Sequence, residues 1–327
     1  MELLFLGTSS GTPTRSRNVS GLALREDAGK GWYLIDCGEG TQHQVLRTPL
    51  SLSALRAIFI THVHGDHCFG LPGLLASAAL QGRKAPLEII APEGVESWLK
   101  ATFAISHTYL PYPLVFHAVE HIRDWRSPQV WVRAAPLSHR SPSYAYRFEE
   151  ARPDTTLDIN RLEQEAIPRG PLWGQLARGV DAEHDGRVLH SADYLLPSRP
   201  PRVIVVGGDN DTPALLADAC QGAQVLVHEA TYSQTDLNDV RCSHGHSTAL
   251  AVAAFAQRSE VPNLVLTHFS ARYQSHPGRG ACIHALYDEA KAHYQGTLFL
   301  AEDFLRLRLD KEGVLRRVST DSAGRPL

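Results

Sequence analysis

Short apolar runs alternate along the chain with segments whose apolar residues recur at helical spacing. In the first half, this pattern predicts strands within residues 1–8, 21–26, 31–40, 55–67, 87–92, 114–119 and 130–139, and helices over 71–82 and 94–103. In the second half, it predicts strands over 202–209, 223–230 and 263–270, and helices over 212–221 and 247–257. Such alternation is typical of an α/β fold, in which layers of helices cover sheets.

The pattern changes between residues 149 and 195. Here the periodicity fades, Pro and Gly accumulate, and an acidic stretch follows at residues 181–187. We predict that residues 149–195 are an insertion without a core of their own, within a single domain that spans residues 1–327.

The composition is that of an ordinary globular protein, with 43% hydrophobic and 20% charged residues. A net charge of −3 excludes a broadly basic surface for coating nucleic acid, although a local basic patch remains compatible with it. The five cysteines are scattered without CxxC pairing, which is typical of reduced thiols in the cytoplasm. The apolar run at the start lacks a basic region and is too short for a signal peptide or a membrane span. We therefore expect a cytoplasmic protein that does not associate with membranes.

Imidazoles and a carboxylate crowd together directly after the apolar run that ends at Ile60. His62, His64, Asp66 and His67 would repel one another if the histidines were protonated, whereas neutral imidazole and carboxylate are common metal ligands. Other apolar runs end in the same residue types: His139, Asp209, the pair His228 and Glu229, and His268. The ends of aligned strands can gather on one edge of a fold. A single strand-end histidine is more often a hydrogen-bonded polar group than a ligand, but the combination predicts a metal site.

The motif H-x-H-x-D-H with a distant His, Asp and His resembles that of the metallo-β-lactamase superfamily. The resemblance implies an αββα sandwich with a dinuclear metal site on one edge. It also implies two sets of ligands, which are His62, His64 and His139 for one ion and Asp66, His67 and His268 for the other, with Asp209 bridging the two. Zinc is the expected ion, and manganese or cobalt are the alternatives for such ligands.

Further motifs resemble those of ribonuclease Z, the endonuclease that trims the 3′ end of precursor tRNA. They are FLGTSSGTPTRSRN at residues 5–18, DCGEGTQHQ at 36–44, FGLPGLL at 69–75, HEAT at 228–231, GHST at 245–248, HFSARY at 268–273 and AEDF at 301–304. The resemblance covers nearly the whole chain and is nearest to the short bacterial form, also called ribonuclease BN. One position departs from the family pattern, because Asn210 stands where the family motif GDT has Thr.

The resemblance implies a mechanism as well. Two metal ions would share and activate a hydroxide that cleaves the 3′ trailer and leaves a 3′-hydroxyl on the tRNA. Asp66 resembles the general base of the family, and His246 resembles its proton donor, with Glu229 as the support of His246. Without the family, a helix cap at Ser247 or Thr248 would be the preferred explanation of the GHST motif.

The insertion also finds a role through the resemblance. Residues 167–179 resemble the tip of the flexible arm with which ribonuclease Z grips tRNA, and this tip carries Arg169 and Arg178 and no acidic residue. Basic and apolar side chains together suit recognition of folded RNA by its backbone and shape. In the family the arm of one subunit serves tRNA bound at the other, so a homodimer is expected. The alternative is a merely exposed loop.

Two other functions remain open at this point. One is a small-molecule hydrolase on the same fold, such as an arylsulfatase, a lactonase or a phosphodiesterase, although such substrates need no extended arm. The other is a non-catalytic RNA-binding relative, although such a protein has no need of the complete ligand set.

Overall fold

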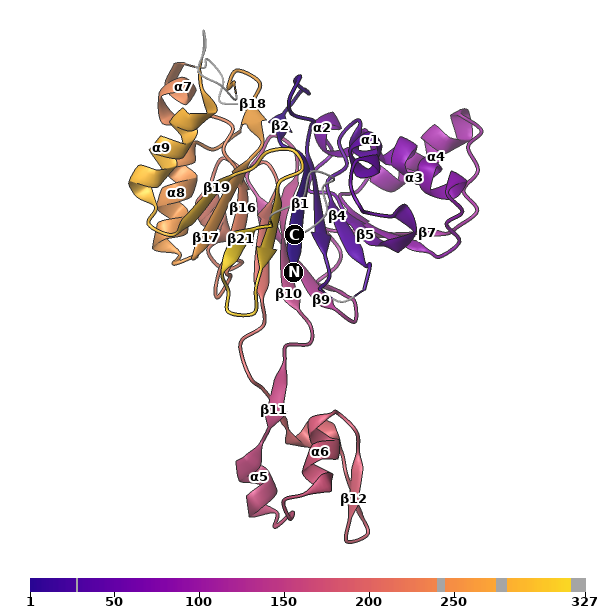
Figure 1. Ribbon diagram of the computed structural model, residues 1–327. Helices are drawn as coiled ribbons and strands as arrows, with labels where there is room; N and C mark the ends of the chain where they lie inside the picture. Colours follow the sequence, from indigo (N-terminus) through magenta and orange to yellow (C-terminus); the bar gives the residue numbers. More distant parts are fainter. Residues whose placement is uncertain (28, 240–244, 275–280, 319–327) are drawn as a thin grey trace.

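Two large β-sheets pack face to face and helices cover the outer face of each, so the expected αββα sandwich is confirmed (Figure 1). The computed structural model describes residues 1–27, 29–239, 245–274 and 281–318. Both ends of the described chain lie in the first sheet, in the strands β1 and β21.

Within these residues the first sheet has eight strands in the order β21-β20-β1-β3-β4-β5-β6-β7. It is antiparallel from β21 to β4 and parallel from β4 to β7. The strands are β1 Glu2–Gly7, β3 Gly21–Arg25, β4 Trp32–Ile35, β5 Leu55–Phe59, β6 Leu87–Ala91, β7 Leu114–Ala118, β20 Arg306–Leu309 and β21 Leu315–Arg317.

The second sheet of the described chain has seven strands in the order β19-β17-β16-β15-β10-β9-β8. Its strands from β15 to β19 are parallel, and those from β15 to β8 are antiparallel. They are β8 Trp125–Arg126, β9 Val130–Leu137, β10 Ser143–Glu150, β15 Val203–Gly207, β16 Val225–Glu229, β17 Asn263–Thr267 and β19 Thr297–Leu300. A short parallel pair, β2 Ser9–Ser10 with β18 Phe269–Ser270, connects the two halves.

The strands read as continuous apolar runs because both faces of each sheet are covered. In β1, Leu3 and Phe5 face the core between the sheets, whereas Leu4 and Leu6 face the helices. Aromatic rings fill the middle of the inter-sheet core, where Phe59 lies 5.1 Å from Phe148 between ring centroids. This packing fixes the position of one sheet relative to the other.

The helices form the two outer layers. On the first sheet lie α1 Thr41–Leu46, α2 Gly65–Cys68, α3 Leu71–Leu80 and α4 Val95–Ile105, and beside the second lie α7 Gln234–Asp239, α8 Ala249–Arg258 and α9 Ile283–His293. The predicted helix over 212–221 is wrong: only the 3₁₀ helix η3, Pro213–Leu216, forms, and turns lead from it to Gly222 (φ 65°). No helix in the described ranges is long and apolar enough to cross a membrane.

The insertion projects from the sandwich as an arm, which we define as residues 151–202 between β10 and β15 (Figure 1). A two-stranded stalk of β11 and β14 carries two short helices and a hairpin. The elements are β11 Thr155–Leu157, α5 Ile159–Gln164, α6 Pro171–Ala177, β12 Ala182–His184, β13 Arg187–Leu189, the 3₁₀ helix η2 Ser191–Tyr194 and β14 Leu195–Pro197.

The expectation that this insertion lacks a core of its own is wrong. The arm buries its own cluster of apolar side chains, namely Leu162, Ile167, Leu176, Ala182, Leu189 and Tyr194. These residues follow no regular period, because each short element contributes only one or two of them. The arm therefore shows no regular spacing of apolar residues in the sequence, although it contains a small core.

Ion pairs fix the root of the arm to the sandwich. Glu150, at the end of β10, accepts hydrogen bonds from Arg199 (2.7 Å) and Arg202 (2.6 Å). Burial alone would raise the pKa of Glu150, but these two guanidinium groups outweigh it and lower the pKa to about 2. Asp154 in turn contacts Arg199 and Lys311. These ion pairs thus hold the two segments of the stalk where they leave the sheet.

Candidate metal centre

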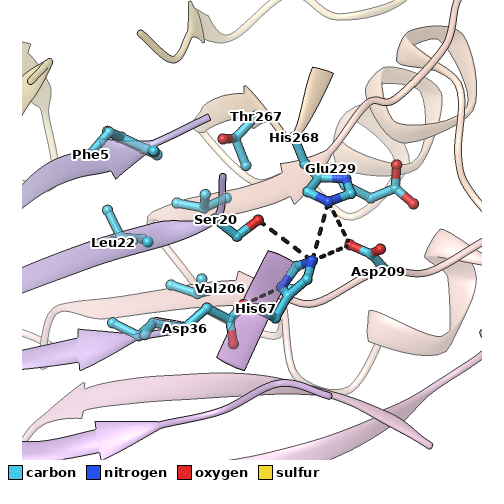
Figure 2. Close-up of a pocket in the computed structure, with 15 residues that line it drawn as sticks. Phe5, Ser20, Leu22, Asp36, His67, Val206, Asp209, Glu229, Thr267 and His268 are labelled. Atoms are coloured by element: carbon cyan, nitrogen blue, oxygen red, sulfur yellow. Dashed lines mark hydrogen bonds and ion pairs between the residues drawn. The ribbon is translucent and has the colours of Figure 1, made fainter. Parts of the chain in front are cut away.

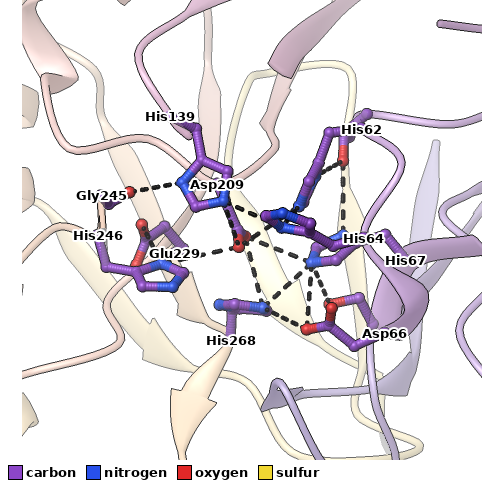
Figure 3. Close-up of polar contacts among 12 residues, drawn as sticks. His62, His64, Asp66, His67, His139, Asp209, Glu229, Gly245, His246 and His268 are labelled. Carbon is purple, nitrogen blue, oxygen red and sulfur yellow. Dashed lines mark hydrogen bonds and ion pairs between the residues drawn. The ribbon is translucent and has the colours of Figure 1, made fainter. Parts of the chain in front are cut away.

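The loops that follow strands of both sheets meet at one edge of the sandwich (Figure 3). The first sheet contributes His62, His64, Asp66 and His67 after β5, and the second contributes His139 after β9, Asp209 after β15 and His268 after β17. Gly208 allows the close approach of the sheets, because a Cβ atom at this position would lie 2.6 Å from the Cβ atom of Thr61. All predicted metal ligands are therefore brought together.

One group of potential ligands consists of His62, His64, His139 and Asp209. The Nδ1 atom of His64 lies 3.0 Å from Nε2 of His62 and 3.1 Å from Nε2 of His139. The outer nitrogen of His139, Nδ1, donates to the carbonyl oxygen of Gly245 at 2.8 Å. Its Nε2 therefore carries a lone pair that points into the group.

A second group consists of Asp66, His67 and His268. The Nε2 atoms of His67 and His268 lie 3.2 Å apart, and Oδ2 of Asp66 lies 3.3 Å from Nε2 of His268. The outer nitrogen of His67, Nδ1, donates to Asp36 at 2.7 Å, which again leaves its Nε2 as the inward lone pair. Asp36 itself is held by the backbone and hydroxyl groups of Thr61.

Asp209 faces both groups with different oxygens. Its Oδ2 lies 3.6 Å from Nε2 of His62 and 3.8 Å from Nε2 of His139. Its Oδ1 lies 3.4 Å from Nε2 of both His67 and His268. One carboxylate between two sets of imidazoles is the arrangement that a bridging ligand requires.

These residues fit divalent metal ions. Ligands about 2.0–2.1 Å from a tetrahedral ion lie roughly 3.4 Å from one another. The facing atoms of the two groups and Asp209 lie 3.0–3.8 Å apart, which is close to this spacing. Converging lone pairs of imidazoles and carboxylates repel each other unless a cation or a proton lies between them. The His/Asp cluster is therefore a divalent-metal site by its chemistry.

The charges within the site are strongly coupled. Burial lowers the pKa of His62, and the neighbouring histidines lower it further. Burial would also lower the pKa of His67, but the carboxylates of Asp209, Asp36 and Asp66 outweigh burial and raise it to about 10. The excess of negative charge around His67 is what a metal cation would balance.

Two residues of the site have a strained backbone. Asp36 (φ 58°) and His268 (φ 57°) adopt the left-handed conformation, which residues other than glycine rarely do. Such conformations persist where the surrounding structure fixes them, and they often occur at functional sites.

His246 lies beside the two groups and is paired with Glu229, as predicted (Figure 3). Its Nδ1 donates to Oε1 of Glu229 at 3.0 Å, and the same oxygen accepts the backbone N–H of Ser247. Burial would lower the pKa of His246, but the carboxylate of Glu229 outweighs it and raises the pKa to about 9. The alternative explanation of GHST also holds in part, because the side chain of Thr248 caps α8 through the N–H of Ala251.

Several contacts in the site had no signal in the sequence. The backbone N–H of Gly11 donates to Oδ2 of Asp66 at 2.7 Å, across 55 positions. The side chain of Asn210 contacts His228, which is fully buried and holds no metal-facing position. These contacts join residues far apart in sequence, so no local motif predicts them.

A cavity of about 40 Å³ lies behind His67 and His268, between the sheets (Figure 2). Ser20 and Thr267 line it together with apolar side chains of β1, β3 and β15. It has room for a water molecule or two and none for a substrate.

The two arginines predicted to bind tRNA lie far from this edge, in the arm. Arg169 pairs with Glu163, and its guanidinium carbon lies 5.2 Å from the ring centroid of Trp173. Arg178 ends α6 and is exposed. Leu172 and Trp173 pack against the core of the arm instead of being fully exposed.

Comparisons with known proteins agree with this geometry. Residues 31–158 match a family model described as the Beta-lactamase superfamily domain. Ribonuclease Z of Pseudomonas putida strain W619 is 55% identical over 319 residues, 98% of this chain and 99% of the relative. Ribonuclease Z of Marinobacter nauticus is 53% identical over 320 residues, 97% and 99% of the two chains. The crystal structure of the short form of human tRNase Z has a TM-score of 0.65 and 28% identity, covering 95% of this chain and 100% of that one.

We expect the purified protein to hold about two divalent ions per chain, and Asp209→Ala to lose most of them, because one carboxylate faces both groups. Elemental analysis after dialysis measures the content. Asp211→Ala, which removes an exposed carboxylate two positions away, is the matched control and should keep the wild-type content. Full metal content in Asp209→Ala would contradict the bridging role.

Proposed function

The chain belongs to the ribonuclease Z family, and we infer from this that it is an endoribonuclease which removes the 3′ trailer from precursor tRNA. The cut leaves a 3′-hydroxyl on the tRNA. One observation supports this function at the level of residues. Asp209 lies between the two groups of potential ligands, and the pair of His246 and Glu229 lies beside it.

The site would hold two divalent ions, which we propose to be zinc, with the ligand sets described above and Asp209 between them. When bound, such ions act as Lewis acids on the phosphate and make water a nucleophile near neutral pH. Asp66 is the general base of the proposal: its Oδ2 lies 3.3 Å from Nε2 of His268 and is oriented by the N–H of Gly11. It would take the proton of the attacking water.

His246 is the proposed general acid. As water attacks phosphorus, the bond to the 3′-oxygen of the tRNA breaks and that oxygen needs a proton. Since Nδ1 of His246 is engaged by Glu229, Nε2 is the nitrogen that would donate. The carboxylate of Glu229 keeps the imidazole protonated at neutral pH, against the cost of burial.

The two other candidate functions lose their support. A small-molecule hydrolase would need neither the arm with its own core nor the resemblance over the whole chain. A non-catalytic RNA-binding protein would not need buried ligands with their supporting hydrogen bonds, since buried polar groups are costly.

We place tRNA on the arm of the partner subunit. The arm and the metal centre lie at opposite ends of β10, whose eight residues span about 25 Å. The arm of one chain therefore points away from the metal centre of the same chain, and a second subunit can present its arm to that centre. Arg169 and Arg178 are the proposed phosphate contacts, and the cytoplasm is the proposed location, where precursor tRNA is found in bacteria.

An exposed apolar surface suits a homodimer. Leu46, at the end of α1, is 70% exposed, and Leu80, at the end of α3, is 91% exposed. Leu46 lines a pocket together with Ser77 and Gln81, and these two residues flank Leu80 in the sequence. A second copy of the chain would cover both side chains, which otherwise leave apolar surface in water.

The first test concerns His246. His246→Ala should lower kcat by about 10²–10⁴-fold while metal content and KM stay unchanged, because a general acid acts only in the transition state. The wild-type kcat should fall as the pH rises through the pKa of His246, and the variant should lose that fall. His117→Ala is the matched control, because it also removes a histidine that pairs with a glutamate. Nε2 of His117 lies 3.1 Å from Oε2 of Glu88, and this pair lies away from the metal centre. Unchanged cleavage, or loss of metal, in His246→Ala would contradict the role.

The second test removes the arm. Replacement of residues 155–197 by a short turn keeps the ion pairs at the root of the arm and removes its core as a unit. Metal content and hydrolysis of bis(p-nitrophenyl) phosphate should persist, whereas KM for precursor tRNA should rise because binding energy is lost. Equal losses of both activities would mean that the arm is structural.

A double variant makes the arm test sharper. Arg169→Ala with Arg178→Ala should reduce the slope of log affinity against log salt by about 1 for each lost phosphate contact. The matched control changes Arg308 and Arg316, whose side chains are 63% and 71% exposed on the sandwich. A slope equal to that of the control would exclude phosphate contacts at these two arginines.

The third test concerns the dimer. Leu80→Glu should convert the dimer to a monomer, since it places a charge in an apolar interface. Light scattering measures the mass. Leu215→Glu is the control, because Leu215 is 48% exposed on the opposite helical layer. A monomeric wild type would rule out the homodimer, and a dimeric Leu80→Glu would place the interface elsewhere.

A further inference from the structure

Asn210 directly follows Asp209, and its side chain is fully buried, with 0% exposure. This is the position at which the chain departs from the GDT motif of the family. A buried amide has several hydrogen-bonding groups, and each must find a partner to avoid a cost in stability. The partners of Asn210 lie on three different elements that lead into the metal centre.

The amide oxygen of Asn210 reaches the loop that carries His139. It accepts the backbone N–H of Ser138 at 3.2 Å and that of Thr212 at 3.1 Å. Since both partners are N–H donors, the orientation of the amide is determined. The N–H of Asp211 donates to the carbonyl oxygen of Ser138 at 2.9 Å, so the loop before His139 is tied to residues 210 and 211 in both directions.

The amide nitrogen of Asn210 reaches β16. It lies 3.1 Å from Nε2 of His228. Nδ1 of His228 lies 2.7 Å from the carbonyl oxygen of Glu229, which can only accept, so Nδ1 carries the proton. Nε2 is therefore the acceptor, and Asn210 donates to it. His228 thus acts as a fixed support behind the amide.

The backbone of Asn210 reaches the pair of His246 and Glu229. Its N–H donates to Oε1 of Glu229 at 3.2 Å, the oxygen that also accepts from His246. Its carbonyl oxygen accepts the hydroxyl of Ser247 at 2.5 Å. Asn210 therefore contacts Ser138, which precedes His139, and also Glu229 and Ser247, the hydrogen-bond partner and the next residue of the proposed general acid.

We propose that Asn210 is a positioning residue that sets His139 and Asp209 relative to Glu229 and His246, with His228 as its support. This inference rests on the proposed function, because the ligands and the acid are assigned there. A planar amide offers an acceptor and a donor in fixed directions, whereas the Thr of the family motif offers one hydroxyl on a shorter side chain. In this chain the pair of Asn210 and His228 connects the three strand ends.

The test compares two buried asparagines. Asn263 is 2% exposed and also makes three hydrogen bonds, to Gln224, Gly313 and Leu315, so Asn263→Ala deletes the same group away from the metal centre. Three quantities are measured for each variant: the Tm of the metal-free protein, the affinity for Zn²⁺ in competition with a chelator, and kcat and KM on precursor tRNA.

Asn263→Ala should lower the Tm of the metal-free protein and leave the affinity for Zn²⁺ unchanged. Asn210→Ala should in addition lower the affinity for Zn²⁺ or kcat by about 10–100-fold with KM unchanged, the range that partners of metal ligands usually show. Asn210→Thr should recover part of this loss, because its hydroxyl can accept one of the two N–H groups.

Three results would overturn the inference in different ways. If Asn210→Ala loses no more affinity and kcat than Asn263→Ala, Asn210 is merely structural while the proposed function stands. If Asn210→Ala does not fold, Asn210→Thr decides, because it lacks the planar amide, and wild-type affinity and kcat in that variant exclude a positioning role of that amide. A wild-type protein that binds no Zn²⁺ would overturn the metal centre itself, and this inference with it.

Discussion

The carboxylate of Asp209 lies between two sets of imidazoles, each of which draws on both sheets, and this constraint determines much of the fold around it. His62 and His67 follow a strand of the first sheet, whereas Asp209 and His268 follow strands of the second. The oxygens of one carboxylate reach both sets only if the sheets keep one separation and one offset. The aromatic core between the sheets supplies that rigidity, with Phe59 packed against Tyr146 and Phe148.

The same constraint explains why negative charge collects at this edge and why Asp36 and His268 keep a left-handed backbone there. Asp36 accepts the hydrogen bond of the outer nitrogen of His67, and Thr61 holds Asp36 in place. The backbone of Asp36 is in the left-handed conformation at this position. Metal ions would compete there with protons for the inward nitrogen lone pairs, so metal binding and the protonation of these histidines are linked. Part of the stability of this edge is therefore expected to come from the bound ions.

The sequence was informative wherever a single local rule decided the outcome. Strands buried on both faces produce unbroken apolar runs, and metal ligands at their ends follow as isolated polar residues, so β5 with His62 and β15 with Asp209 could be predicted. The core of the arm could not, because Leu162, Leu176 and Tyr194 share no period. The contacts of Asn210 with Ser138 and His228 depend on tertiary folding alone. The strands β19 to β21 were also missed, since they are short and their pairing partners are distant in sequence.

The arm is, in its connectivity, an enlarged loop of a β-hairpin. Glu149 of β10 and Val203 of β15 are direct partners in the antiparallel ladder, so the chain leaves and re-enters the sheet at neighbouring positions. The entropic cost of closing such a loop grows slowly, by about 0.6 kcal/mol for each doubling of its length. Evolution can therefore shorten, exchange or elaborate this segment without moving the strand ends that carry the proposed catalytic groups. Substrate choice and bond cleavage can thus diverge independently within one lineage of enzymes.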